Sequence, residues 1–359
     1  MKKILLLCVI IFGITGCYDY QELNDRAIVS GISIDFENEE YIVNYEILNN
    51  LKTEEPQYKA YMVEGRGETV VEAFENASET VSKETYLSHL KVLIIGENAA
   101  ESKLRDIVDY MLREPYIRNI FSPVIAKNSS ARKILASTDK ETPVVSEKIE
   151  SLIRNNKYNE EISLKIDFDH FMDQYEDERI DPVLTAIELI DEKPSIAGLA
   201  VLKGGKLKTI LDEELSAVFN VLNNKSSYHS IKIPCNDKEG YTILSLYNNK
   251  KTELEIKEDT IKIKSKLNAS VVKDSCGLDF RDGTIYNDLS EKFAEVLKQE
   301  YELFWMTMTK EEADILGLQK KYYQKTKKEL NDWKNIKMES EIKININKNG
   351  KTFEVKKDE

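Results

Sequence analysis

The residue of this sequence with the clearest chemical role is Cys17, which ends a short apolar segment near the N-terminus. Two lysines precede that segment, residues 4–14 are almost entirely apolar, and Thr15 and Gly16 stand directly before the cysteine. This order is typical of a secretory signal with a lipobox, in which a peptidase cuts before a cysteine whose thiol carries a diacylglyceryl group. The alternative is an ordinary signal peptide with a chance cysteine. We expect residues 1–16 to be a signal peptide and Cys17 to be lipidated.

A second candidate site is the acidic segment that begins at Asp167. Counted from this residue, positions one, three, seven and twelve carry carboxylates, as in an EF-hand calcium loop. That loop also requires an oxygen ligand at position five and glycine at position six, where Phe171 and Met172 stand. We therefore interpret the segment as a solvated acidic helix with an apolar inner side. The carboxylates are those of Asp167, Asp169, Asp173 and Glu178.

Other motifs for metal binding or catalysis are incomplete. The three histidines lie far apart, without a cysteine or histidine at ligand spacing, and we interpret them as structural: His89, His170 and His229. Gly31-Ile32-Ser33 matches half of a nucleophile elbow, but the second glycine is absent. With 64 acidic residues, pairs of carboxylates arise anywhere by chance. We expect no catalytic residues, no metal, no cofactor and no enzymatic activity.

Composition limits the possible partners. The chain has 359 residues, which is long enough for two or three domains, and a formal net charge of −13. An acidic surface repels phosphate backbones, so we expect no nucleic-acid partner. Membrane attachment must then come from the N-terminal lipid. Outside the predicted signal and the lipobox, Cys235 and Cys276 remain, either as one disulfide or as two partly buried thiols.

Strand and helix patterns alternate over residues 17–192, which we expect to form an N-terminal α/β domain. The run from His89 to Gly96 is apolar on both faces at its end and predicts a central strand. An apolar stripe at helical spacing predicts a helix over 68–82. The other predicted strands are 27–36, 41–48, 58–63, 121–127 and 183–190, and the other helices 101–113 and 143–154. This alternation of strands and helices predicts a mixed sheet with packed helices.

The rest of the chain predicts two further domains. Residues 193–238 predict a small middle domain, with a hairpin around Lys203-Gly204-Gly205 and a short helix. Residues 239–359 predict a C-terminal α+β domain, an antiparallel sheet with long helices. Its expected elements are a hairpin of 254–256 with 261–269, helices over 288–308 and 310–333, and a hairpin at Asn349-Gly350. The predicted fold class is α+β, with three domains of mixed or antiparallel sheets.

Aromatic residues near the C-terminus allow two interpretations. Tyr322, Tyr323 and Trp333 form either a partner-binding face or part of the core. Helical aromatic stripes usually face the core, so the second interpretation is favoured.

The ordered motifs resemble those of the Ger(x)C family, the C subunits of spore nutrient-germinant receptors. The N-terminal marker begins at the lipobox cysteine with Cys17-Tyr18-Asp19. It continues with Glu22-Leu23-Asn24-Asp25, Ala27-Ile28-Val29 and Gly31-x-x-Ile34-Asp35. The family usually has Trp where Tyr18 stands. Further matching pieces are 89–97, Arg113 with Arg118, Ala131 with Ile134 and Leu135, Ala313-Asp314-Ile315-Leu316-Gly317, and Asp332-Trp333. Leu318 and Gln319 replace the Phe and Gly that end the family's A-D-x-x-G-F-G segment.

The resemblance implies a three-domain α+β lipoprotein on the outer face of the spore's inner membrane. It implies an A subunit and a permease-like B subunit as partners, and a part in nutrient-triggered germination without enzymatic activity. A different class remains as the alternative, a lipid-anchored solute-binding protein of a transporter. Such proteins usually have two similar α/β lobes around a cleft, and the antiparallel C-terminal half argues against that arrangement.

Overall fold

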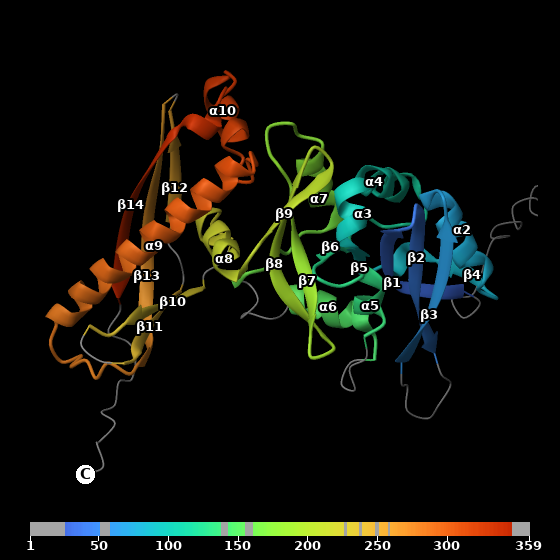
Figure 1. The fold of residues 1–359 in the computed structure, drawn as a ribbon, viewed down its shortest axis with the longest axis horizontal. Coiled ribbons are helices and arrows are strands. Elements are labelled where there is room, and N and C mark those ends of the chain that lie inside the picture. The colour runs from blue at the N-terminus through green and yellow to red at the C-terminus, as the bar shows by residue number, and fades with distance from the viewer. Residues whose placement is uncertain are drawn as a thin grey trace, which may run out of the picture.

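The computed structural model shows an elongated molecule built around two β-sheets (Figure 1). The N-terminal part occupies the right of that view and the C-terminal part the left. The structure describes residues 26–50, 58–137, 143–154, 161–225, 228–236, 239–247, 251–257 and 259–346. Cys17 and the hairpin predicted at Asn349-Gly350 lie outside these residues. No helix in the described part of the chain has the length and apolar composition needed to cross a membrane.

The first sheet contains the strands β1 Arg26–Glu37, β2 Glu40–Asn50, β3 Tyr58–Gly67, β4 Glu84–Tyr86, β5 Val92–Ile95, β6 Ser122–Ala126, β7 Val183–Ile190, β8 Lys193–Lys203 and β9 Lys206–Leu211. Their order is β3-β2-β1-β5-β6-β7-β8-β9, and β4 pairs with the start of β1. The pairs of β1, β5, β6 and β7 are parallel, and the outer pairs are antiparallel. This confirms the mixed sheet and the central position predicted for the strand that ends at Gly96.

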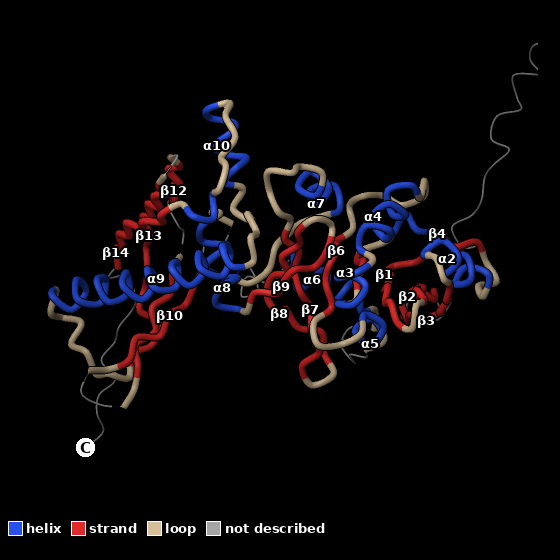
Figure 2. Tube along the Cα trace, turned by 45° about the horizontal axis from the view of Figure 1, so that its top comes forward, coloured by secondary structure: helices blue, strands red, loops and turns tan. Residues whose placement is uncertain are grey.

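Helices cover both faces of the first sheet (Figure 2). One face packs against α2 Val70–Glu79, α3 Glu97–Ser102, α4 Leu104–Arg113 and α7 Phe168–Tyr175. The other packs against α5 Ala131–Leu135 and α6 Val145–Arg154. Strand β5 contributes Leu93 to the first core and Val92 to the second, so its apolar residues are buried on both faces. A strand in such a position reads as a continuous apolar run.

The second sheet contains β10 His229–Pro234, β11 Tyr241–Leu246, β12 Lys251–Ile256, β13 Thr260–Asp274 and β14 Lys337–Ile346. It is antiparallel except for the pair of β13 and β14. A parallel pair needs a crossover, and α9 Thr284–Lys310 with α10 Leu318–Thr326 provides it. Helix α9, predicted over 288–308, lies along the sheet with Phe293, Leu297 and Tyr301 buried in the core.

The single helix predicted over 310–333 is wrong. Helix α9 ends at Lys310, the chain turns, and α10 begins only at Leu318. Both Glu312 and Gly317 have positive φ angles, of 57° and 62°, so the backbone leaves the helical region between the two helices. The apolar spacing continues through this turn because its residues are also buried.

The segment predicted as a middle domain is divided between the two sheets. Its hairpin, β8 with β9, extends the first sheet because β8 pairs antiparallel with β7. Its helix, α8 Glu213–Leu222, contacts β8 and β9 as well as β10, β12 and α9. Helix α8 is buried from Leu215 to Leu222, and its apolar residues belong to the core of the second sheet. The division into three domains stays a prediction.

Candidate functional site

The motif residues near the N-terminus form a buried helix-capping site in the first sheet. Asp35 lies in β1, and its carboxylate accepts hydrogen bonds from the backbone N–H groups of Ala131 and Arg132 at 2.8 and 2.9 Å. These groups begin α5. Burial raises the pKa of Asp35. A Cβ at Gly96 would lie 2.3 Å from the Asp35 carboxylate, so only glycine fits beside it.

Glu46 of β2 plays the same part for α6, on the same face of the sheet. Its carboxylate accepts hydrogen bonds from Val145 N at 2.6 Å and Ser146 N at 3.2 Å, and from the hydroxyl groups of Ser30 and Ser146. The Glu46 side chain is buried, which raises its pKa. Sequence reasoning missed this residue. The available signal was a carboxylate at an inward position of a largely apolar strand, two residues after Asn44.

The C-terminal motif forms the junction between the two sheets. Asp314 is 1% exposed, and its carboxylate accepts hydrogen bonds from Leu318 N and Gln319 N, each at 2.8 Å, at the start of α10. Burial raises the pKa of Asp314 to about 6. Its backbone pairs with Asp181, which precedes β7 of the first sheet: Asp181 N donates to Asp314 O at 3.1 Å, and Asp314 N donates to the Asp181 carboxylate at 2.7 Å.

Gly317 permits the close approach at this junction. Its φ angle of 62° is left-handed, and a Cβ there would lie 3.0 Å from Ile180 Cδ1. The Ala-Asp-x-x-Gly spacing therefore has a structural explanation: the aspartate caps α10 and the glycine lets that helix meet the segment before β7. Gln319 replaces a family glycine, and its backbone N–H still donates a hydrogen bond to the Asp314 carboxylate.

Ion pairs surround the junction. Arg179 makes two contacts to Glu329, at 2.7 and 3.3 Å, and its guanidinium lies 4.1 Å from the ring centre of Tyr323. Lys320 Nζ lies 3.0 Å from the Asp177 carboxylate. Beside these pairs is an open cleft of about 490 Å³, lined by α7, α8 and α10. Its charged lining residues are Lys165, Asp173, Lys225, Lys320 and Lys321, of which Lys321 donates a hydrogen bond to the carbonyl of Leu316.

His229, the first residue of β10 in the second sheet, is held between two carboxylates. Its Nε2 lies 2.7 Å from Glu300 of α9, and its Nδ1 lies 2.9 Å from Glu161. Burial alone would lower the pKa of His229, but the hydrogen bonds to both carboxylates outweigh it and raise the pKa to about 9. The imidazolium therefore links β10, α9 and the segment before α7. The structural role predicted for this histidine is confirmed, whereas its two partners were not predicted.

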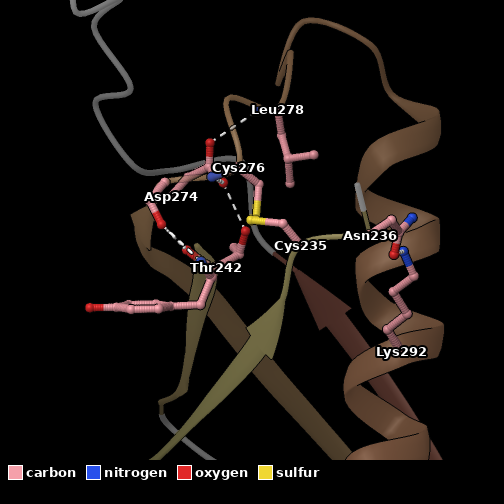
Figure 3. Close-up of a disulfide and its surroundings, with 9 residues drawn as sticks. Cys235, Asn236, Thr242, Asp274, Cys276, Leu278 and Lys292 are labelled. Atoms are coloured by element: carbon pink, nitrogen blue, oxygen red, sulfur yellow. Dashed lines mark hydrogen bonds between the residues drawn. A yellow bond between two sulfur atoms is a disulfide. The ribbon is translucent and has the colours of Figure 1, made fainter. Parts of the chain in front are cut away.

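A disulfide resolves the alternatives left open for the two late cysteines. Cys235 and Cys276 are bonded, which joins the end of β10 to the segment after β13 (Figure 3). Asp274 supports this end of the sheet by accepting hydrogen bonds from Thr242 Oγ1 at 2.8 Å, Cys276 N at 3.0 Å and Leu278 N at 2.9 Å. The disulfide therefore links the ends of β10 and β13, between which β11 lies in the sheet.

The acidic segment near Asp167 forms helix α7 as interpreted. Asp167 caps this helix by accepting a hydrogen bond from His170 N at 3.0 Å. The apolar residues of the segment, Phe168, Phe171 and Met172, are buried. Within the described ranges, no group of three His, Cys, Asp or Glu side chains is arranged to hold a metal ion.

The C-terminal aromatic residues belong mainly to the core. Tyr322 and Trp333 are buried, and Trp333 packs edge-on against Trp305 of α9 at 5.8 Å. Tyr323 is partly exposed beneath Arg179. The interpretation as core is confirmed for the two buried residues.

These sites share one chemical pattern. The buried carboxylates of Asp35, Glu46 and Asp314 each accept backbone N–H groups at the start of a helix. Their acceptor capacity is used within the fold. The arrangement fixes helices against sheets and one sheet against the other, as a rigid interaction scaffold requires.

Comparison with known proteins identifies the family. Residues 19–189 match the model of the spore germination protein N-terminal domain, and residues 197–351 match the spore germination B3/GerAC-like C-terminal model. The chain belongs to the Ger(x)C family of germinant receptor C subunits. It is 31% identical to spore germination protein KC of Bacillus subtilis over 39% of this chain and 37% of that protein. It is 24% identical to spore germination protein GerQC of Bacillus cereus over 71% of each chain.

The fold agrees with a solved structure. The crystal structure of the GerBC protein matches with a TM-score of 0.55 at 15% identity, over 91% of this chain and 99% of that one. The match to protein KC covers well under two thirds of that relative, and the match to YfkR of Bacillus subtilis covers 62% of it. Because the solved structure matches over 91% of this chain, the α+β fold predicted from sequence is confirmed.

Proposed function

We propose that this protein is a lipid-anchored subunit of a spore germinant receptor, needed for nutrient-triggered germination. Cys17 would hold it on the outer face of the spore's inner membrane. One observation carries the proposal: the lipobox cysteine stands two positions before residue 19, where the N-terminal family match begins. Anchor and receptor domain are thus directly adjacent.

The protein acts by contact with an A subunit and a permease-like B subunit. The relatives named as spore germination proteins support membership in a receptor. The fold is consistent with a subunit that acts by contact, because its buried carboxylates hold helices in place. A rigid body beside the membrane presents constant surfaces to neighbouring subunits.

The experiment compares two cysteine variants in a sporulating host. Cys17→Ala removes the acylation site, and Cys8→Ala changes a cysteine within the predicted signal peptide as a matched control. We expect Cys17→Ala spores to lose this protein from their membranes and to lose the response to the nutrients its receptor detects, at unchanged spore yield. Cys8→Ala spores should behave as wild type. A normal response from Cys17→Ala spores contradicts the proposal.

A second candidate function is solute binding, and the cleft at the junction is the observation that favours it. Four lysines and the apolar residues Phe219, Ile315 and Leu316 line this cleft. A small anion with an apolar part would match such a lining. Calorimetric titration of the protein with amino acids and sugar acids tests this function. Saturable heat that is lost in the Lys225→Ala variant supports it, and the absence of heat rejects it.

A further inference from the structure

Several strands of the first sheet begin at one edge, which we call the strand-start edge. β1, β5 and β6 are parallel neighbours, and Gly31 of β1 is in register with the first residues of β5 and β6, Val92 and Ser122. Lys91 N donates to Ser30 O at 2.8 Å, and Ser122 N donates to Lys91 O at 2.8 Å, which fixes this register. β1 extends beyond Gly31 to Arg26, where it pairs with β4. The described chain therefore starts at this edge.

Three exposed apolar side chains lie at the same edge. Leu112, Tyr116 and Ile120 are 45%, 64% and 55% exposed, and all three lie in the last turn of α4 or in the segment that leads into β6. Ser88 Oγ donates a hydrogen bond to Tyr116 O at 2.7 Å. Because Ser88 follows β4 by two residues, this bond places Tyr116 next to the start of β1.

Cationic and aromatic groups flank these side chains. The Arg26 guanidinium lies 4.8 Å from the ring centre of Tyr86 in β4. The Arg118 side chain is exposed and makes no hydrogen bond or ion pair with any residue that the structure describes. We define the strand-start surface as Arg26, Tyr86, Leu112, Tyr116, Arg118 and Ile120. It combines apolar, aromatic and positively charged groups, and the exposed Glu84 of β4, which is in register with Arg26, is its acidic neighbour.

The distance to the predicted anchor decides what meets this surface. Arg26 follows Cys17 by nine positions. A chain of that length spans at most about 30 Å even when fully extended. An acyl group on Cys17 therefore keeps the strand-start edge near the bilayer. Another exposed apolar side chain, Val272, lies in β13 of the second sheet, at the opposite side of Figure 1 from β4.

We propose that the strand-start surface rests on the lipid bilayer, with the headgroup and upper acyl region as its occupant. This inference rests on the proposed lipidation of Cys17. Tyrosine is favoured at the membrane interface, leucine and isoleucine gain by leaving water, and arginine attracts lipid phosphates. Each contact is weak alone. The anchor makes the second contact intramolecular, so a small surface is sufficient to orient the body.

The consequence is a defined orientation. The first sheet stands next to the membrane on its strand-start edge, and the opposite edge of that sheet faces away. Ile190, at the end of β7, lies at this opposite edge because β7 is parallel to β6. Its side chain is 51% exposed, which makes it a matched control for Tyr116.

The test uses the full acylated protein in phosphatidylglycerol and phosphatidylethanolamine vesicles that carry a nitroxide on the lipid. The variants Tyr116→Cys, Ile120→Cys and Ile190→Cys each add one thiol for an environment-sensitive fluorophore. Labelling is selective because Cys235 and Cys276 are bonded to each other and Cys17 would carry the lipid. We expect the nitroxide lipid to cause a loss of emission from the first two positions and none from the third.

If emission is equal at all three positions in protein that floats with the vesicles, the proposed contact between the strand-start surface and the bilayer is overturned. The lipidation of Cys17 is still supported in that case. If the fluorophore at position 116 becomes shielded only after receptor partners are added, the proposed bilayer contact is also overturned, because the occupant is then a protein. If the protein does not float and the mass of its N-terminal peptide shows no lipid, both the lipidation of Cys17 and the bilayer contact of the strand-start surface are rejected. Loss of emission at 116 and 120 alone supports the proposal.

Discussion

Asp181 and Asp314 are joined by two hydrogen bonds across the junction of the two sheets. The N–H of Asp181 donates to the carbonyl of Asp314 at 3.1 Å, and the N–H of Asp314 donates to the carboxylate of Asp181 at 2.7 Å. The Asp314 carboxylate is thereby left to cap α10. These two residues, which are 133 positions apart, join the segment before β7 to the start of α10.

Asp181→Ala should destabilise the junction. The substitution removes the acceptor of the Asp314 N–H, and a buried donor left without a partner costs roughly 1–3 kcal/mol of unfolding free energy. Chemical denaturation of the purified protein measures this loss. A separate transition for the C-terminal half is a further expected sign, because the contact between the two sheets is weakened.

The control for this change is Glu178→Ala on the same segment. Glu178 is exposed, and changes at such positions alter the unfolding free energy by less than about 0.5 kcal/mol. Equal stability of both variants would show that the Asp181 carboxylate does not help to hold the junction.

Glu46→Ala should be more damaging than an average surface change. It leaves the N–H groups of Val145 and Ser146 and the hydroxyl of Ser146 without their acceptor in a buried site. The expected loss in unfolding free energy is on the order of 3 kcal/mol. Glu147→Ala, an exposed position in the first turn of α6, should cost less than about 1 kcal/mol. Denaturation curves of the two variants that coincide would contradict this account of α6.

The buried His229 should make stability depend on pH. Its pKa is raised to about 9 in the folded protein, from 6.5 for a free histidine. Its contribution is therefore complete below pH 6.5 and is lost as the pH rises through 9. Relative to a His229→Gln variant, wild type should lose on the order of 3 kcal/mol of its stability advantage over this window.

Unfolding free energies at several pH values between 6 and 10 test this prediction. His89→Gln is the control, because the His89 side chain is exposed. A wild-type advantage over His229→Gln that stays constant across the window would show that the imidazolium is not held between Glu161 and Glu300.

Reduction of the disulfide should destabilise the second sheet. Cys235 and Cys276 are 41 positions apart, and a loop of this length predicts a contribution of about 2–4 kcal/mol. Thermal unfolding with and without a reductant should therefore differ for wild type. The double variant Cys235→Ser, Cys276→Ser should unfold at the lower temperature in both conditions. A wild-type midpoint that does not respond to the reductant would contradict the prediction.

Local patterns made much of the fold predictable. Helix α2 follows the stripe of Val70, Phe74 and Ala77, all buried, and Thr69 caps it in a box with Glu72. The run that became β5 is buried on both faces, as an uninterrupted apolar strand must be. In these cases the spacing of apolar side chains directly reflects which face meets the core.

Contacts between distant residues were not predictable. The break between α9 and α10 depends on Asp314 meeting Asp181, which no local pattern reveals. The parallel pairing of β14 with β13 likewise depends on the crossover by α9, since alternating apolar residues fit either direction. The partners of His229 come from Glu161 and Glu300, far away in sequence. Spacing within an element carries no information on such pairs.

Lipidation of Cys17 is tested by the mass of the N-terminal tryptic peptide of the protein purified from spore membranes. Cleavage before Cys17 and after Arg26 gives the peptide of residues 17–26. We expect this peptide to carry a diacylglyceryl group on Cys17, and the intact protein to stay with the membrane after washing with salt. An unmodified peptide from a freely soluble protein would contradict this expectation.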